Sequence, residues 1–468
     1  MKGGGGGKRA IMHSYIAIGF LWEFFLNIFM LHILKMKILF NKLLLPFILQ
    51  HLHTMKIEES RMAAVLRPGV KKLAGMFSEH GYEVRIAGGA VRDLLLGKVP
   101  HDLDFATTAT PEQMKSIFET EGVRMINAGG EKHGTVTVRL EDENYECTTL
   151  RIDLVTDGRH ATVQFTQDWE LDANRRDLTI NAMFLGLDGT VYDYFNGSKH
   201  LQDRFVTFVG DADKRIKEDY LRILRYFRFY GRIAEGPDNH SPEVLESIKK
   251  NVEGLGKISG ERIWVELQKI ITGNYGGDLL IKMVECGLNP YIGFPENLDC
   301  DNVRCVYKRC EEANIQVKEM HHMTLLASGL SSEEECIKLI ARIKCSKREQ
   351  EILLHIIKYR DFAMQATSLK EIKDLLVDLV IGEKRNKDVA LFYVSEILKY
   401  TCRIEYLNAL QDWNLPRFPV NGNMIGEKGI PRKKTKFVLN DLLEEWKKSD
   451  FSLNAKDLLD TLDIERYQ

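Results

Sequence analysis

The chain has 468 residues, of which 44% are hydrophobic and 28% are charged, which is typical of several soluble globular domains. Its formal net charge of −2 excludes binding to a nucleic acid through a global positive field, so such a partner requires local basic patches. The eight cysteines include no C-x-x-C motif, which favours ordinary thiols over a zinc site or a disulfide framework.

Residues 1–54 differ in composition from the rest of the chain. They contain six basic residues and one acid, Glu23, and residues 15–34 form a largely apolar run. A basic, apolar and acid-poor segment is typical of organelle targeting. The run is long enough to anchor the chain in a membrane, although Glu23 makes that costly. The segment also fits an upstream extension of the gene, with Met55 as the working start. These three interpretations remain open.

The first chemical signal is a strand followed by a glycine turn. Residues 84–87 form a short apolar strand, Gly88 and Gly89 break it, and a helix is expected from residue 91 to 96. Backbone N–H groups at a helix start bind phosphate, and Arg92 adds a positive charge in the first turn. The pattern therefore indicates a phosphate-binding turn, although two glycines before a helix are more often a simple turn.

Two acids follow on the next predicted strand, residues 100–108. Alternate residues of a strand point to the same face, so Asp102 and Asp104 are expected to project side by side. Two carboxylates this close repel each other unless a cation lies between them, and hard oxygen ligands suit Mg²⁺. An isolated D-x-D is usually a polar strand edge. Beside the glycine turn, it predicts a nucleoside triphosphate bound with a metal.

A third acid is expected from a hairpin. Residues 131–140 and 145–154 are β-rich runs separated by the polar stretch EDEN. Glu146 lies in the second run, and this run is expected beside the strand of the two aspartates, which would complete a two-metal site. Asp142 and Glu143 are expected in the turn, exposed to solvent. These elements predict a mixed α/β domain that ends near residue 205.

From about residue 210 helical periodicity dominates the chain. Residues 217–232 are predicted to form one amphipathic helix, and residues 258–272 form another, with Ser259 as its cap. A basic run at residues 431–436 precedes a predicted helix at 437–448. This run is either an RNA contact or a solvated run of charges.

Five motifs occur in one order: RIAGGAVRDLLLGKVPHDLDFATTATPEQM, DGRH, RRDLTINAMF, EDYLRILR and ISGERIW. In this order they resemble the class II CCA-adding enzymes, which are tRNA nucleotidyltransferases of the polymerase-beta-like superfamily, and look most like the eukaryotic mitochondrial-type enzyme. The resemblance is strongest over residues 80–295. It implies an α+β fold, in which an N-terminal mixed α/β head with a small β-sheet precedes an all-helical neck, body and tail.

The resemblance also implies domain boundaries and site residues. The expected domains are the N-terminal extension, the catalytic head, the neck with a base-reading motif, the body and the tRNA-binding tail, at residues 1–54, 55–205, 206–290, 291–400 and 401–468. The acids expected to hold two Mg²⁺ ions are Asp102, Asp104 and Glu146. Nucleotide-binding residues are expected at Gly88, Gly89, Arg92, Arg175, Arg176, Asp177, Asn181, Asp219, Arg222 and Arg225. A mobile loop is expected at Asp157, Gly158, Arg159 and His160, and tRNA contacts at Arg432, Lys433, Lys434 and Lys436.

Asp219 and Arg222 also have a chemical rationale of their own. Cytosine and adenine both present an amine donor beside a ring-nitrogen acceptor, which a carboxylate and a guanidinium match. Uracil and guanine present a carbonyl beside an N–H, so both contacts would be lost. One acid and one arginine can therefore select C and A together. The alternative is an ordinary surface helix, in which Glu218 and Arg222 form a salt pair four residues apart.

The implied activity is template-independent addition of CMP and AMP, from CTP and ATP, to the 3′ end of tRNA by a two-metal in-line attack that releases pyrophosphate. The implied partners are tRNA, CTP and ATP, with no stable protein partner, and the chain is expected as a monomer or homodimer. The implied location is the mitochondrion, with the cytoplasm and nucleus reached through an alternative start near Met55. The rival functions are a polymerase restricted to one base, such as a poly(A)-type enzyme, and a non-catalytic RNA-binding protein.

Overall fold

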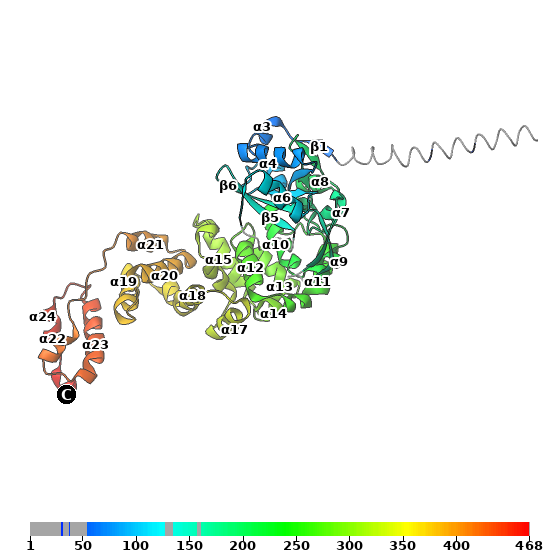
Figure 1. Cartoon of the computed structure of the whole chain (residues 1–468). Coiled ribbons are helices and arrows are strands. Elements are labelled where there is room, and N and C mark those ends of the chain that lie inside the picture. The colour runs from blue at the N-terminus through cyan, green and yellow to red at the C-terminus, as the bar shows by residue number, and fades with distance from the viewer. Residues whose placement is uncertain (1–29, 31–36, 38–53, 127–133, 157–160, 468) are drawn as a thin grey trace, which may run out of the picture. The chain divides into compact units, whose positions relative to one another are not determined.

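The computed structural model describes residues 30, 37, 54–126, 134–156 and 161–467 (Figure 1). Nearly all of the N-terminal extension and the predicted loop at 157–160 therefore lie outside the described residues. The chain divides into two compact units: unit 1 is Met1–Leu154 with Thr162–Asp203, and unit 2 is Val155–Ala161 with Arg204–Gln468. In the part of the chain that is described, no helix is long and apolar enough to cross a membrane.

Unit 1 is built on a mixed sheet whose eight strands have the order β1-β10-β9-β2-β3-β6-β5-β4. Within the described strands of this sheet, β3 and β6 pair in parallel, and all other neighbouring pairs are antiparallel. The strands are β1 (Thr54–Lys56), β2 (Val84–Ala87), β3 (Asp104–Thr107), β4 (Arg124–Ile126), β5 (Thr135–Leu140), β6 (Glu143–Thr149), β9 (Phe184–Leu185) and β10 (Thr190–Tyr192). A separate two-stranded sheet contains β7 (Arg151–Thr156) and β8 (Ala161–Phe165).

The helices of unit 1 are α3 (Glu59–Met62), α4 (Pro68–Glu79), α5 (Gly89–Leu95), α6 (Pro111–Thr120), α7 (Trp169–Asn174) and α8 (Gly197–Gln202). Helices α4 and α6 both pack against β5. Their rings Phe77 and Phe118 meet edge to face, with centroids 5.8 Å apart, and both side chains are fully buried. This apolar layer packs on β5, which pairs directly with β6.

The predicted hairpin is confirmed, but two details were wrong. Its turn is only Glu141 and Asp142, whose φ angles of +48° and +63° give the twist that a two-residue hairpin needs. Glu143 already belongs to β6, and its carboxylate accepts from Arg67 at 2.7 Å instead of facing solvent alone. The second run is also two strands, because β6 ends at Thr149 and β7 begins at Arg151, with buried Leu150 between them.

The described regular elements of unit 2 after residue 204 are helical. They include α9 (Ala212–Glu218), α10 (Arg222–Ile233), α11 (Pro242–Asn251), α12 (Gly260–Ile271), α13 (Gly276–Glu285), α14 (Asn289–Ile292), α15 (Cys300–Glu312), α16 (His322–Leu326), α17 (Glu333–Ile343), α18 (Lys347–Gln365), α19 (Leu369–Val377), α20 (Lys387–Tyr400), α21 (Ile404–Gln411), α22 (Gly422–Glu427), α23 (Thr435–Lys448) and α24 (Ala455–Asp460). The predicted α+β class is thereby confirmed.

The single helix predicted for residues 217–232 is wrong. The chain leaves the helix at Asp219, whose φ of −153° and ψ of 106° are extended, and α10 begins three residues later. The Asp219 carboxylate then accepts from the backbone N–H of Leu221 at 3.1 Å. This local bond stabilises a break that apolar periodicity does not reveal, because the spacing of apolar residues continues across it.

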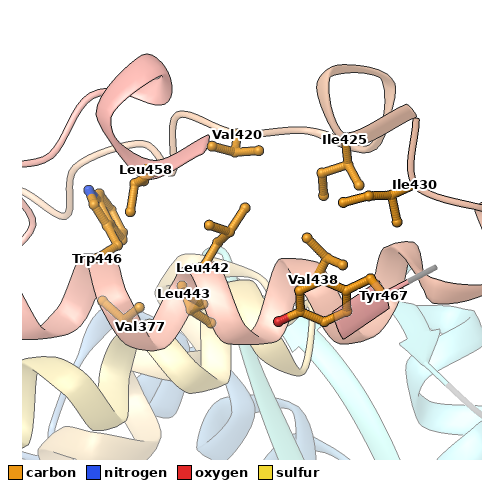
Figure 2. Close-up of a cluster of buried hydrophobic side chains, with 10 residues drawn as sticks. All are labelled: Val377, Val420, Ile425, Ile430, Val438, Leu442, Leu443, Trp446, Leu458 and Tyr467. Atoms are coloured by element: carbon orange, nitrogen blue, oxygen red, sulfur yellow. The ribbon is translucent and has the colours of Figure 1, made fainter. Parts of the chain in front are cut away.

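The C-terminal helices pack around a small hydrophobic core that also includes Val377 of α19 (Figure 2). Val438, Leu442 and Trp446 follow one side of α23, and Leu458 of α24 and Ile425 of α22 lie over them in the close-up. These side chains are almost completely buried. Helix α23 begins at Thr435, two residues before the predicted start, and the preceding basic residues form a 3₁₀ turn over Arg432–Lys434.

Candidate active site

The parallel pairing of β3 with β6 brings two of the predicted acids together. Asp104 and Glu146 are direct partners across the two strands, so their side chains start from neighbouring positions on the sheet. Asp102 precedes β3 in a bend and is not part of the strand as predicted. Leu103 between the aspartates is buried, with 6% exposure. All three acids line one cavity of about 470 Å³.

The charges in this cavity are concentrated around Asp104. Burial, Glu146 and Asp102 raise the pKa of Asp104, and Arg176 opposes this rise. Asp102 is largely exposed and lies 2.9 Å from Nδ1 of His101. Among the residues that the structure describes, no three His, Cys, Asp or Glu side chains are yet gathered around one point as a metal site. The donor chemistry nevertheless fits Mg²⁺, because three carboxylates share one cavity and a cation would relieve their repulsion.

The predicted glycine turn joins β2 to α5, and the helix starts at Gly89, two residues earlier than expected. Gly88 has a φ of +65°, a region that favours glycine. A Cβ on Gly88 would lie 3.1 Å from Nη1 of Arg176. The turn and Arg176, both predicted to bind the nucleotide, are therefore neighbours in the fold.

Three other predicted nucleotide-binding residues form an interior network. Arg92 is 3% exposed, and its Nη1 donates to Oδ1 of Asn181 at 2.6 Å. The Asn181 amide in turn donates to Asp177 at 3.3 Å, and Asp177 also accepts from the backbone N–H of Leu178 at 2.8 Å. This network ties α5 to the 3₁₀ turn at Thr179–Asn181. The structure thus brings Arg92 and Asn181 together, inside unit 1.

Arg175 and Arg176 share a carboxylate that the sequence analysis missed. Asp172 of α7 accepts from Nε of Arg175 at 2.8 Å and from Nη2 of Arg176 at 3.1 Å. The available signal was the spacing, because residues three and four positions apart on a helix lie on one face.

The predicted base-reading pair lies in unit 2. Asp219 accepts from Nη2 of Arg262, in α12, at 2.8 Å, and α12 packs against α10. Arg222 donates from Nη1 to Glu218 at 2.7 Å, so the salt pair of the surface interpretation is present. The guanidinium of Arg225 lies 5.5 Å from the ring centre of Phe229. Each of these predicted nucleotide-binding residues therefore already has protein contacts.

The predicted tRNA contacts lie at the start of α23. Arg432, Lys433 and Lys436 are exposed, and Lys434 is half-buried. The ring of Phe437 beside them is also 64% exposed.

Two family models match the chain. One, described as the poly A polymerase head domain, covers residues 84–207, and the other, described as the probable RNA and SrmB-binding site of polymerase A, covers residues 240–297. The head-domain match includes the three acids, the glycine turn, Arg175 and Arg176.

Close relatives extend this similarity to nearly the whole chain. The chain is 47% identical to CCA tRNA nucleotidyltransferase 1, mitochondrial, of Danio rerio over 90% of its length and 96% of that protein, and 48% identical to the Homo sapiens protein of the same name over 88% and 93%.

Solved structures agree with the fold. The Bacillus stearothermophilus CCA-adding enzyme in complex with CTP superimposes with a TM-score of 0.62 at 25% identity, covering 82% of this chain and 94% of that one. The Thermotoga maritima CCA-adding enzyme complexed with tRNA has the same fold, with a TM-score of 0.62 at 19% identity and coverage of 87% and 98%. Because the relatives from Danio rerio and Homo sapiens are 47% and 48% identical to this chain over nearly their full length, the chain belongs to the CCA tRNA nucleotidyltransferase family.

Proposed function

We propose that this chain adds CMP and AMP, from CTP and ATP, to the 3′ end of tRNA without a template and releases pyrophosphate. The observation that carries the proposal is the parallel pairing of Asp104 with Glu146 in a cavity shared with Asp102. The names of the near-full-length relatives support the choice of reaction. The solved relatives with CTP and with tRNA support the choice of substrates.

In this proposal the three carboxylates would hold two Mg²⁺ ions. When bound, such ions supply positive charge that lowers the pKa of the tRNA 3′-hydroxyl and neutralises the triphosphate. Arg175 and Arg176 bind and orient the triphosphate, so that its α-phosphate faces the attacking hydroxyl in line. The bond from the tRNA 3′-oxygen to the α-phosphorus forms as the bond from that phosphorus to pyrophosphate breaks, and the hydroxyl proton is released to solvent.

Base choice is assigned to Asp219 and Arg222. The Asp219 carboxylate accepts from Arg262 in the structure, and a carboxylate has lone pairs left for the amine of cytosine or adenine. Arg222 has five N–H donors in a fork, so it can keep Glu218 and still donate to the ring nitrogen of the base. Arg262 and Glu218 would then hold the pair in place instead of competing with the base.

The tail and the N-terminus complete the proposal. The exposed basic residues at the start of α23 contact the tRNA backbone, because A-form RNA presents phosphates and 2′-hydroxyls. The names of the relatives support a mitochondrial location. A start at Met55 would give cytoplasmic and nuclear forms, and it would retain Met55 and Lys56 of β1.

Incorporation of labelled nucleotides into tRNA with defined 3′ ends tests this function. CTP alone should extend tRNA that lacks its terminus, ATP alone should extend only tRNA that already ends in CC, and both together should restore CCA. Runs of A added with ATP alone to the shortest tRNA would support a poly(A)-type enzyme. Binding of tRNA without Mg²⁺-dependent incorporation would instead support a non-catalytic RNA-binding protein.

A further inference from the structure

Asp172 is a buried carboxylate between the two arginines proposed to bind the triphosphate. Its side chain is 1% exposed. One oxygen, Oδ1, accepts from Nε of Arg175 at 2.8 Å and from the backbone N–H of Arg151 at 3.1 Å. The other, Oδ2, accepts from Nε and Nη2 of Arg176 at 3.3 and 3.1 Å. Both oxygens are thus used, and they hold Arg175 through Nε and Arg176 through Nε and Nη2.

The local fold places this carboxylate firmly. Asp168 caps α7 by accepting from the backbone N–H groups of Glu170 and Leu171 at 2.9 and 3.2 Å. Asp172 therefore lies in a short, capped helix that ends just before the two arginines. Burial alone would raise the pKa of Asp172, but Arg176 and Arg175 lower it, so the carboxylate is ionised at neutral pH and keeps both ion pairs.

Arg176 is held from other directions as well. Its guanidinium lies over the ring of Phe184, 4.8 Å from the centroid, and its Nη1 donates to the carbonyl of Asn181 at 3.4 Å. The same Nη1 is next to the Gly88 turn, and the charge of Arg176 acts on Asp104. Arg175 and Arg176 nevertheless keep side-chain exposures of 17% and 19%, so both remain partly accessible, and Arg176 does so beside the Gly88 turn.

We propose that Asp172 is a positioning residue, which holds Arg175 and Arg176 where their guanidinium groups meet the triphosphate of the incoming nucleotide. This inference rests on the proposed function, since it assigns the two arginines to CTP and ATP. The triphosphate is common to both nucleotides and the base is not. Loss of Asp172 therefore weakens binding of CTP and ATP by the same factor and leaves base choice unchanged.

The test is steady-state kinetics of Asp172→Asn with CTP and with ATP on matched tRNA ends. Asparagine keeps the shape of the side chain and removes the charge that orders the arginines. We expect KM to rise about tenfold or more for both nucleotides, with kcat within about threefold of wild type. Asp172→Glu keeps the charge and shifts the guanidinium groups by one methylene. It should raise KM for both nucleotides by a smaller common factor, about threefold.

Asp193→Asn is the matched control. Asp193 is also a buried acid of unit 1, with 7% exposure, but it accepts from the backbone N–H groups of Gly197 and Ser198, both at 2.8 Å. This variant should lower the melting temperature and leave both KM values unchanged.

The proposal is overturned if folded Asp172→Asn keeps wild-type KM values, or if KM changes for one nucleotide only. If Asp172→Asn does not fold, Asp172→Glu decides the question by the same criterion. A wild-type chain that incorporates neither nucleotide counts against the proposed function itself, and this outcome is distinct from an active wild type with insensitive Asp172 variants.

Discussion

Asp219 and Arg222 give the sharpest prediction at the scale of single residues. Asp219→Ala should weaken discrimination between CTP and UTP, because the carboxylate rejects a carbonyl at that position. Arg222→Ala should slow the use of both CTP and ATP, because the ring nitrogen loses its donor. Each lost charge-assisted bond should cost about 1.5–3 kcal/mol, or roughly ten- to a hundredfold in kcat/KM. The measurement is kcat/KM for all four nucleotides.

The neighbouring residues supply the controls for this experiment. Lys217→Ala removes an exposed ion pair with Asp213, two residues before Asp219 in the chain, and leaves Asp219, Arg222 and their partners in place, so base selectivity should be retained. If Asp219→Ala and Arg222→Ala also keep wild-type rates and selectivity, α10 is only an amphipathic element and base choice is made elsewhere.

At the scale of elements, the sequence predicts those turns whose backbone angles favour particular residue types. Gly88 with its positive φ and the polar hairpin turn were both predictable, because special backbone angles demand particular residues. The parallel partnership of Asp104 with Glu146 was only an expectation, since pairing between distant strands has no local signal. Asp172 was missed although its spacing to Arg175 and Arg176 was visible, because spacing alone does not show that the carboxylate is buried between them. The break at Asp219 was missed because apolar spacing continues through it.

Glu349 of α18 connects its own helix to α12 and α16 in unit 2. Its contacts predict how the stability of the fold depends on pH. It accepts from Trp264 at 3.0 Å and Gln268 at 2.9 Å, both in α12, and lies 2.8 Å from Nε2 of His322 in α16. Burial opposes ionisation, but hydrogen bonds from Ser346, His322 and Trp264 lower the pKa of Glu349 to about 2.

A carboxylate with a lowered folded-state pKa stabilises the fold above its unfolded pKa, near 4.5, and loses that contribution as the pH falls towards 2. We expect Glu349→Gln to destabilise the protein by roughly 3 kcal/mol at pH 7 and by much less near pH 3. Chemical denaturation across this range measures the gap. The exposed Glu334→Gln should show no such dependence, and a constant gap for Glu349→Gln would refute the assignment.

The start of α23 predicts how tRNA affinity depends on salt. Replacing Arg432, Lys433 and Lys436 together with alanine should weaken tRNA binding about tenfold or more near 0.1 M salt and make its salt dependence shallower, because fewer counterions are released. The three basic side chains do not belong to the hydrophobic core that α23 forms through Val438, Leu442 and Trp446 (Figure 2), so the fold should be unaffected. Lys448→Ala, at the far end of the same helix, is the single-charge control. Unchanged affinity and slope would leave this run as solvated charge.

At the scale of the whole molecule, the N-terminal segment should be separable from catalysis. Thr54–Lys56 forms β1, which pairs with β10, so the clean truncation removes residues 1–53. This truncated protein should keep wild-type turnover in solution and change its distribution in the cell. A truncation through residue 56 removes β1 and should lower the melting temperature. A soluble but inactive protein lacking residues 1–53 would contradict the targeting interpretation.

The most direct test of the central claim is turnover of CMP addition, with tRNA affinity measured in parallel, for Asp102→Ala and Asp104→Ala. Glu143→Gln, an acid of the same cavity that pairs with Arg67, is the control and should keep most of the activity. Both alanine variants should lose incorporation and bind tRNA as wild type does, because losing a metal site removes several kcal/mol of transition-state stabilisation. Either variant retaining more than about a tenth of wild-type turnover would contradict the two-metal assignment.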